Sequence, residues 1–87
     1  MRREDDGFAA LDLELVYIAK KLKEAQALET ALDQAGFDYL IEADTYRGGL
    51  IFSSQRVGAF FYVEPQTAEA ARELLVRLRY KAYRPKG

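Results

Sequence analysis

The chain has 87 residues and a formal net charge of −1, and its 9.9 kDa limit it to one small domain. Cysteine and histidine are both absent, which excludes disulfides, thiolate zinc sites and histidine-dependent catalytic triads. No apolar run approaches the roughly 18 residues of a membrane span, and the charged start is not typical of a signal peptide. We therefore expect a cytoplasmic protein without metal, cofactor or catalytic residues.

Charge is distributed unevenly along the chain. Residues 1–14 carry two basic and five acidic residues, and residues 15–46 carry three basic and six acidic ones. Residues 47–87 reverse the balance, with eight basic residues against three acidic ones. Solvated surface charge is the plainest interpretation. Complementary self-association, or a basic site for an anionic partner, is the alternative that the asymmetry leaves open.

The first half of the chain predicts a strand followed by a helix. Residues 1–10 are charged and lack periodicity, so we expect a mobile leader before a single domain at residues 11–84. Residues 11–19 become continuously apolar, which favours a strand buried on both faces. Residues 22–35 carry one apolar helical stripe, and Gly36 suits the left-handed position that ends a helix.

The second half predicts two strands and a second helix. Residues 37–46 alternate between apolar and polar side chains, and residues 58–63 are apolar on both faces of a strand that Pro65 stops. A helix follows from Thr67, its expected N-cap, to about residue 82. A short fourth strand at residues 79–83 is the alternative to the last turn of that helix.

A glycine-rich, polar connection links the second and third strands. Arg47, Gly48 and Gly49 are expected to interrupt the second strand as a bulge or turn. Residues 38–63 as a whole predict an extended antiparallel hairpin that projects beyond the core, with its tip near residues 53–56.

An isolated two-stranded ribbon is marginal in water, so the apolar part of this arm needs a partner. That part consists of Leu50, Ile51 and Phe52. We therefore expect the arm to lie across a neighbouring subunit.

This order of elements is that of an α+β, two-layer ferredoxin-like split βαβ fold. This fold has an antiparallel sheet with two helices on one face, and the sequence is compatible with either three or four strands. Particular stretches carry a further resemblance: Val16–Ala19 before Glu24-Ala25, Gln34–Phe37, and Tyr62–Pro65 before Thr67–Leu75. Over about residues 13–78 the chain resembles the small bacterial domains described as prokaryotic signal-transducing proteins, which are related in fold to the nitrogen-regulatory PII proteins. The resemblance implies a regulatory role and supplies no catalytic residues.

Two segments have the chemistry of an anion site. The hairpin connection combines glycine N–H groups, hydroxyls and guanidiniums, which suit phosphate or carboxylate. The first helix begins with lysines and without a capping side chain, a start that a bound anion would favour. A polar turn and solvated lysines are the plainer interpretations. The candidate anion-binding residues are Arg47, Gly48, Gly49, Ser53, Ser54, Arg56, Lys20 and Lys21.

The apolar second face of the predicted sheet indicates self-association. Leaving four or five such side chains exposed would create a patch that is uncommon on a monomer. We expect a homodimer packed sheet face to sheet face, assisted by the hairpin arm. The candidate interface residues are Leu15, Tyr17, Ile51, Phe52, Phe60 and Tyr62.

Together these features predict a small non-enzymatic regulatory or interaction domain that senses a small anion or docks on a partner protein. The alternative is single-stranded nucleic-acid binding, because Phe60 and Tyr62 would form an aromatic face. A sequence pI near 5.4 disfavours that alternative. Glu42 and Asp44 share a strand face as a carboxylate pair, for which a solvated edge strand is the plainer interpretation.

Overall fold

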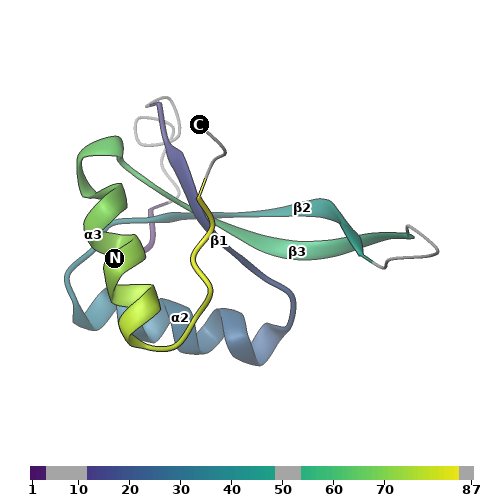
Figure 1. Ribbon diagram of the computed structural model, residues 1–87, viewed down its shortest axis with the longest axis horizontal. Coiled ribbons are helices and arrows are strands. Elements are labelled where there is room, and N and C mark those ends of the chain that lie inside the picture. The colour runs from purple at the N-terminus through teal and green to yellow at the C-terminus, as the bar shows by residue number, and fades with distance from the viewer. Residues whose placement is uncertain (4–11, 49–53, 85–87) are drawn as a thin grey trace.

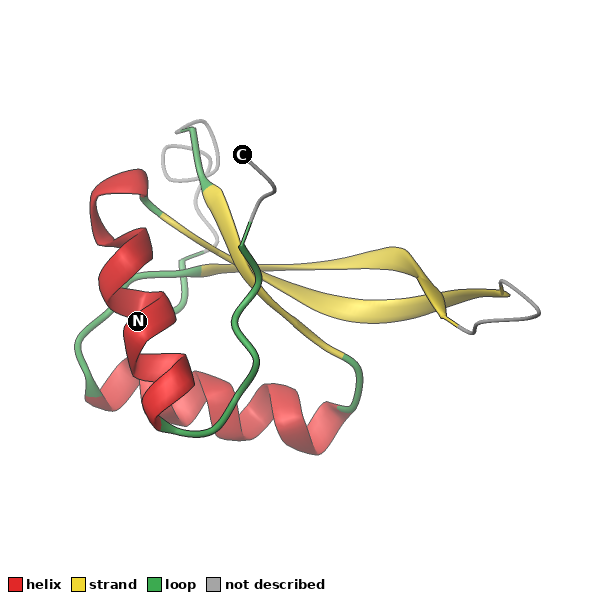
Figure 2. Cartoon of the chain, viewed as in Figure 1, coloured by secondary structure: helices red, strands yellow, loops and turns green. Residues whose placement is uncertain are grey.

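A computed structural model describes residues 1–3, 12–48 and 54–84 of the chain (Figure 1). The described part is a small α+β domain with three strands and two helices, in the order that the sequence predicts (Figure 2). The elements are β1 (Glu14–Ala19), α2 (Leu22–Gln34), β2 (Leu40–Gly48), β3 (Ser54–Val63) and α3 (Pro65–Arg77).

The strands form one antiparallel sheet in the order β1-β3-β2, so β3 lies at its centre. β2 and β3 pair without a register shift from Leu40 opposite Tyr62 to Gly48 opposite Ser54. This confirms the predicted hairpin, which extends well past the helices in Figure 1.

Two details of the hairpin differ from the prediction. Arg47 and Gly48 continue the pairing of β2 and do not interrupt it. Ser54 and Arg56 belong to β3, so the residues that close the hairpin are 49–53, which lie outside the described residues. The apolar arm residues 50–52 lie there too.

The core lies between one face of the sheet and both helices. Leu28 and Leu32 of α2, and Leu75 of α3, are fully buried in one cluster with Phe61 and Val63 of β3. Their spacing along each helix gives one apolar face per helix. Burial of each such side chain favours folding by about 1.5–3 kcal/mol, which explains why the helices need the sheet.

A β-bulge changes which faces the β1 side chains occupy. Leu15 pairs with Tyr62, whereas Tyr17 pairs with Phe61, so Val16 is an extra residue on β1. Tyr17 consequently points with Phe61 into the core. The prediction that Leu15 and Tyr17 share one face is therefore wrong, because it assumed uninterrupted alternation.

The helix α3 ends at Arg77, and the predicted extension to about residue 82 is wrong. Arg79 adopts a left-handed conformation, with φ at 69°, and this turns the chain away from the helix axis.

The segment that follows, residues 80–84, lies against the free edge of β1. There the Tyr83 N–H donates to the carbonyl oxygen of Val16 at 2.7 Å. Residues 79–83, the alternative fourth strand of the sequence analysis, are not assigned to a strand.

Residues 1–3 also contact the sheet. Arg2 forms a parallel bridge with Tyr39, and the Arg3 N–H donates to the Tyr39 carbonyl at 2.6 Å. These residues belong to the expected leader, whose remainder, residues 4–10, lies outside the described residues. Of the helices in the described part of the chain, neither is long and apolar enough to cross a membrane.

Candidate functional site

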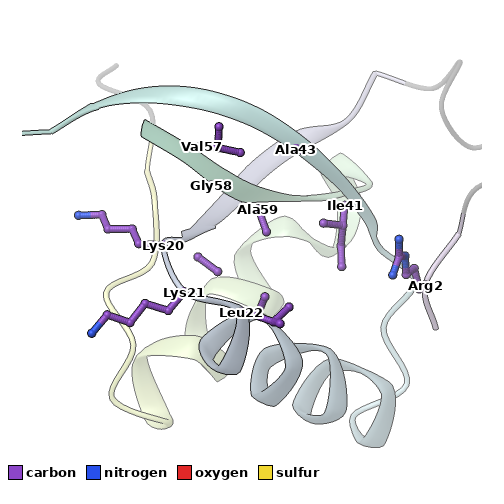
Figure 3. A pocket seen from close by; sticks show the side chains of 11 residues that line it. Arg2, Lys20, Lys21, Leu22, Ile41, Ala43, Val57, Gly58 and Ala59 are labelled. Carbon is purple, nitrogen blue, oxygen red and sulfur yellow. The ribbon is translucent and has the colours of Figure 1, made fainter. Parts of the chain in front are cut away.

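A pocket of about 340 Å³ opens between the start of α2 and the adjoining face of the sheet (Figure 3). We call it the α2 pocket. Its apolar lining comes from the ends of β1 and α2 and from the hairpin: Ala19, Leu22, Ala25, Ile41, Ala43, Val57, Gly58 and Ala59. Three cationic residues complete the lining. Figure 3 shows Lys20 and Lys21 at one end and Arg2 at the other, with the apolar side chains between them.

The local sequence explains why the lysines lie at this position. β1 ends at Ala19, and Lys20 and Lys21 make the turn before α2 begins at Leu22. Lys21 is the N-cap and forms no side-chain hydrogen bond with the first turn. The carboxylate of Glu24 instead accepts a hydrogen bond from the Lys20 N–H at 3.2 Å, which holds this turn against the helix.

A second pocket, of about 460 Å³, lies between β1 and the segment after α3. We call it the C-terminal pocket, and its lining residues are Tyr17, Ile18, Lys20, Lys81, Ala82, Tyr83 and Arg84. Lys20 borders both pockets. The two pockets are therefore neighbours on either side of one lysine side chain.

Among the residues that the structure describes, the charged residues of the two linings are all of one sign. They are five cationic residues, with no acidic one: Arg2, Lys20, Lys21, Lys81 and Arg84. The whole chain has a net charge of −1, so this local excess runs against the overall balance. Carboxylates do lie at the outer margins, because Arg2 is 3.5 Å from Glu29 and Arg84 is 2.9 Å from Glu69. The arrangement favours an anion near Lys20.

The structure separates the predicted anion-binding residues into two groups. Lys20 and Lys21 line the α2 pocket. Arg47, Gly48, Ser54 and Arg56 belong to the paired strands of the hairpin, and the described side chain of Arg56 lines neither pocket, while Gly49 and Ser53 are outside the described residues. The lining residues that the sequence analysis missed come from distant parts of the chain: Arg2, Lys81 and Arg84. The excess of basic residues after position 47 was a signal for Lys81 and Arg84, whereas Arg2 lies in an acidic segment and had none.

The candidate interface residues differ in exposure and in the face of the sheet on which they lie. Tyr17 is 9% exposed and packs edge-on against Tyr80, with 5.5 Å between the ring centroids. Phe60 is 8% exposed, whereas Leu15 and Tyr62 are half-buried on the face away from the helices. Ile51 and Phe52 lie outside the described residues. Self-association stays a prediction, with fewer exposed aromatic rings on this face than we expected.

The surroundings of Tyr62 bear on the nucleic-acid alternative. Burial raises the pKa of Tyr62, and the nearby charges of Glu42 and Asp44 raise it further. These carboxylates would repel phosphate, and Phe60 offers little ring surface for a base to stack on. Within the described part of the chain, no group of three acidic side chains is arranged to hold a metal ion.

The fold and the two linings define a small α+β domain with a cationic pair of pockets. Comparisons with protein-family models, curated proteins and solved structures found no significant match. The chemistry of the pockets therefore carries the functional argument.

Proposed function

We propose that this chain is a non-enzymatic regulatory domain that binds a small anionic ligand at the α2 pocket, next to the C-terminal pocket. The observation that carries the proposal is the lining of both pockets, in which the described residues include five cationic side chains and no acidic one. A local potential of one sign raises the concentration of the opposite ion at a site. The volume of about 340 Å³ lies near the lower limit for small-molecule sites, roughly 300–1,000 Å³.

We further propose that the fold is ferredoxin-like and the role regulatory. Two observations support the fold assignment: the strand order β1-β3-β2, and the position of residues 80–84 along the free edge of β1. The resemblance to prokaryotic signal-transducing domains supports the regulatory role. Because the chain lacks histidine and cysteine, the commonest general base and the strongest side-chain nucleophile are missing, which favours binding over catalysis.

A thermal-shift screen with nucleotides, phosphorylated metabolites and carboxylates tests this proposal. A ligand at 100 times its Kd stabilises the native state by about 2.7 kcal/mol. For a domain of this size each kcal/mol shifts Tm by roughly 4–8 °C, so we expect a rise of about 10 °C or more.

The lysine pair provides the matched comparison. The double variant Lys20→Gln/Lys21→Gln should lose most of the shift, because both side chains line the pocket. Lys23→Gln removes an exposed lysine from the first turn of α2, outside the described lining, and should keep the shift. The proposal fails if no anion in the screen raises Tm, or if Lys23→Gln abolishes the shift as fully as the double variant does.

We also propose that the domain associates with a second copy through its hairpin. The hairpin extends beyond the helices (Figure 1), and Tyr62 on β3 is only half-buried on the face away from the helices. A paired ribbon with apolar residues on its surface is more stable when another surface covers it.

A further inference from the structure

We propose that the ligand of the α2 pocket is amphipathic, with an anionic head at Lys20 and Lys21 and a short apolar body over the pocket floor. A medium-chain or aryl carboxylate belongs to this class. The inference rests on the proposed anion-binding function and narrows it to one kind of molecule.

The described lining of the pocket offers few side-chain partners to a polar ligand body. Apart from the three cationic residues, every described lining residue has an apolar side chain or is glycine, and none of them carries a hydroxyl, amide or carboxylate group. A ribose, a sugar or a nucleobase would give up hydrogen bonds to water here and find few side-chain partners. An apolar ligand body makes no hydrogen bonds to water, so it gives none up when it enters the pocket.

Exposed apolar side chains at the pocket also favour an apolar ligand body. Leu22 is 73% exposed and Val57 is 67% exposed, and both line the pocket. They come from opposite walls, the first turn of α2 and the hairpin (Figure 3). A ligand body lying between them would remove apolar surface of both from water, which favours binding.

The charges determine the direction in which such a ligand lies. Lys20 and Lys21 are together at one end of the pocket, whereas Arg2 is alone at the other (Figure 3). Two cationic residues at the lysine end against one at the other favour the lysine end for an anionic head, and we place the head there. The long lysine stems can cover apolar atoms while their ammonium groups reach the carboxylate.

Isothermal titration calorimetry with four probes tests the inference: octanoate, acetate, inorganic phosphate and 1-octanol. Octanoate has both parts of the proposed ligand, and each of the other probes lacks one of them. We expect octanoate to bind at least tenfold more tightly than any of the three. Lys20→Gln/Lys21→Gln should weaken octanoate at least tenfold and leave 1-octanol within twofold.

A pair of β2 variants tests whether binding occurs at this place. Ala43→Phe should fill the pocket from an exposed position and weaken octanoate at least tenfold. Asp44→Phe adds the same ring at the next residue of β2, which points to the opposite face of the sheet and is outside the lining, and should leave octanoate within twofold. Equal effects of the two rings, or none from Ala43→Phe, would overturn the assignment to this pocket.

The probes distinguish the two proposals from each other. If phosphate or acetate binds as tightly as octanoate and depends on the lysine pair, the anion site stands and the amphipathic inference is overturned. If 1-octanol matches octanoate, or if the lysine pair has no influence, the anion-binding function itself is overturned. If none of the probes binds, this inference fails, and the screen described above decides the function separately.

Discussion

Arg72 carries a full charge although only 6% of its surface is exposed. Its Nε donates to the Tyr83 carbonyl at 2.8 Å and its Nη2 donates to the Leu15 carbonyl at 3.0 Å, while Glu14 lies 3.8 Å away. A buried charge is tolerated only when it is paired and hydrogen-bonded, and this guanidinium meets both conditions. One side chain of α3 thus holds the segment after the helix against the bulged edge of β1.

Removing this guanidinium should destabilise the domain. We expect Arg72→Met to lower the free energy of unfolding by about 2–4 kcal/mol, because two carbonyls lose donors. Arg72→Lys should recover little, since one ammonium group cannot reproduce the fork of donors. Urea unfolding measures the change, and Arg77→Met, an exposed position on the same helix, is the control. Similar losses in Arg72→Met and Arg77→Met would contradict this account.

The buried tyrosines predict a loss of stability at alkaline pH. Burial, together with the nearby Glu24, raises the pKa of Tyr17 from 10.0 to about 12. Burial and a hydrogen bond to Asp33 also raise the pKa of Tyr39. In the unfolded chain these phenols ionise near pH 10, so the unfolded state loses its protons first. The free energy of unfolding is therefore unaffected below about pH 10 and falls as the pH rises above it.

Each retained phenol proton contributes a slope of about 1.4 kcal/mol per pH unit above pH 10. Tyr17→Phe should remove one such contribution, as urea unfolding between pH 8 and pH 12 would show. Tyr83→Phe, at a more exposed position, serves as the control. If the Tyr17→Phe variant keeps the slope of the unaltered chain, the burial of this hydroxyl is not its source.

At the scale of the elements, both helices end in the same backbone motif. After α2, Gly36 has φ at 82° and the Phe37 N–H donates to the Leu32 carbonyl at 3.0 Å. After α3, Arg79 has φ at 69° and the Tyr80 N–H donates to the Leu75 carbonyl at 2.8 Å. These are Schellman endings, one with glycine in the left-handed position and one with arginine.

The two endings should respond oppositely to substitution. Gly36→Ala should lower the free energy of unfolding by about 1–2 kcal/mol through backbone strain alone, because a Cβ there meets no atom within 4 Å. Arg79→Gly should relieve the same strain, offset partly by the entropy of glycine, with a net gain of up to about 1 kcal/mol. Thermal unfolding of both variants, beside Gln34→Ala as the control, measures these effects. A stabilising Gly36→Ala substitution would contradict the assignment.

These endings show which parts of the fold the sequence reveals. Gly36 is a recognisable stop, so the end of α2 was predictable. Arg79 is not a recognisable stop, because few non-glycine residues adopt the left-handed conformation. In addition, the apolar stripe of α3 continues in the sequence beyond the end of the helix. The bulge at Val16 was invisible for another reason: residues 15–19 are all apolar, so alternation cannot assign their faces.

The candidate site was predictable only where its residues are adjacent in sequence. Lys20 and Lys21 depart from the capping preferences of a helix start, and such a departure is a local signal of a functional site. Arg2 reaches the α2 pocket through the bridge of residues 1–3 with Tyr39, just before β2, and Lys81 and Arg84 reach the C-terminal pocket beside the hydrogen bond of Tyr83 with β1. Contacts of that kind depend on tertiary structure and leave no local pattern.

At the scale of the whole molecule, the hairpin should make the protein a homodimer. Sedimentation equilibrium at micromolar concentration should then give twice the 9.9 kDa mass of the chain. The double variant Ile51→Ser/Phe52→Ser should weaken the dimer without changing the far-ultraviolet circular dichroism. Val76→Ser, an exposed position on α3, is the control. A species of 9.9 kDa for the unaltered chain would rule out the dimer.

The strand order also has a consequence for how the chain folds. Gly48 meets Ser54 across a short connection, whereas Glu14 must find Val63 across the whole of α2 and β2. Closing the longer loop costs more entropy, so local pairing precedes distant pairing. We expect β2 and β3 to pair first, and β1 to pair with β3 afterwards. The Tyr83 amide, which needs both β1 and α3 in place, should be the last to gain protection from hydrogen exchange during refolding.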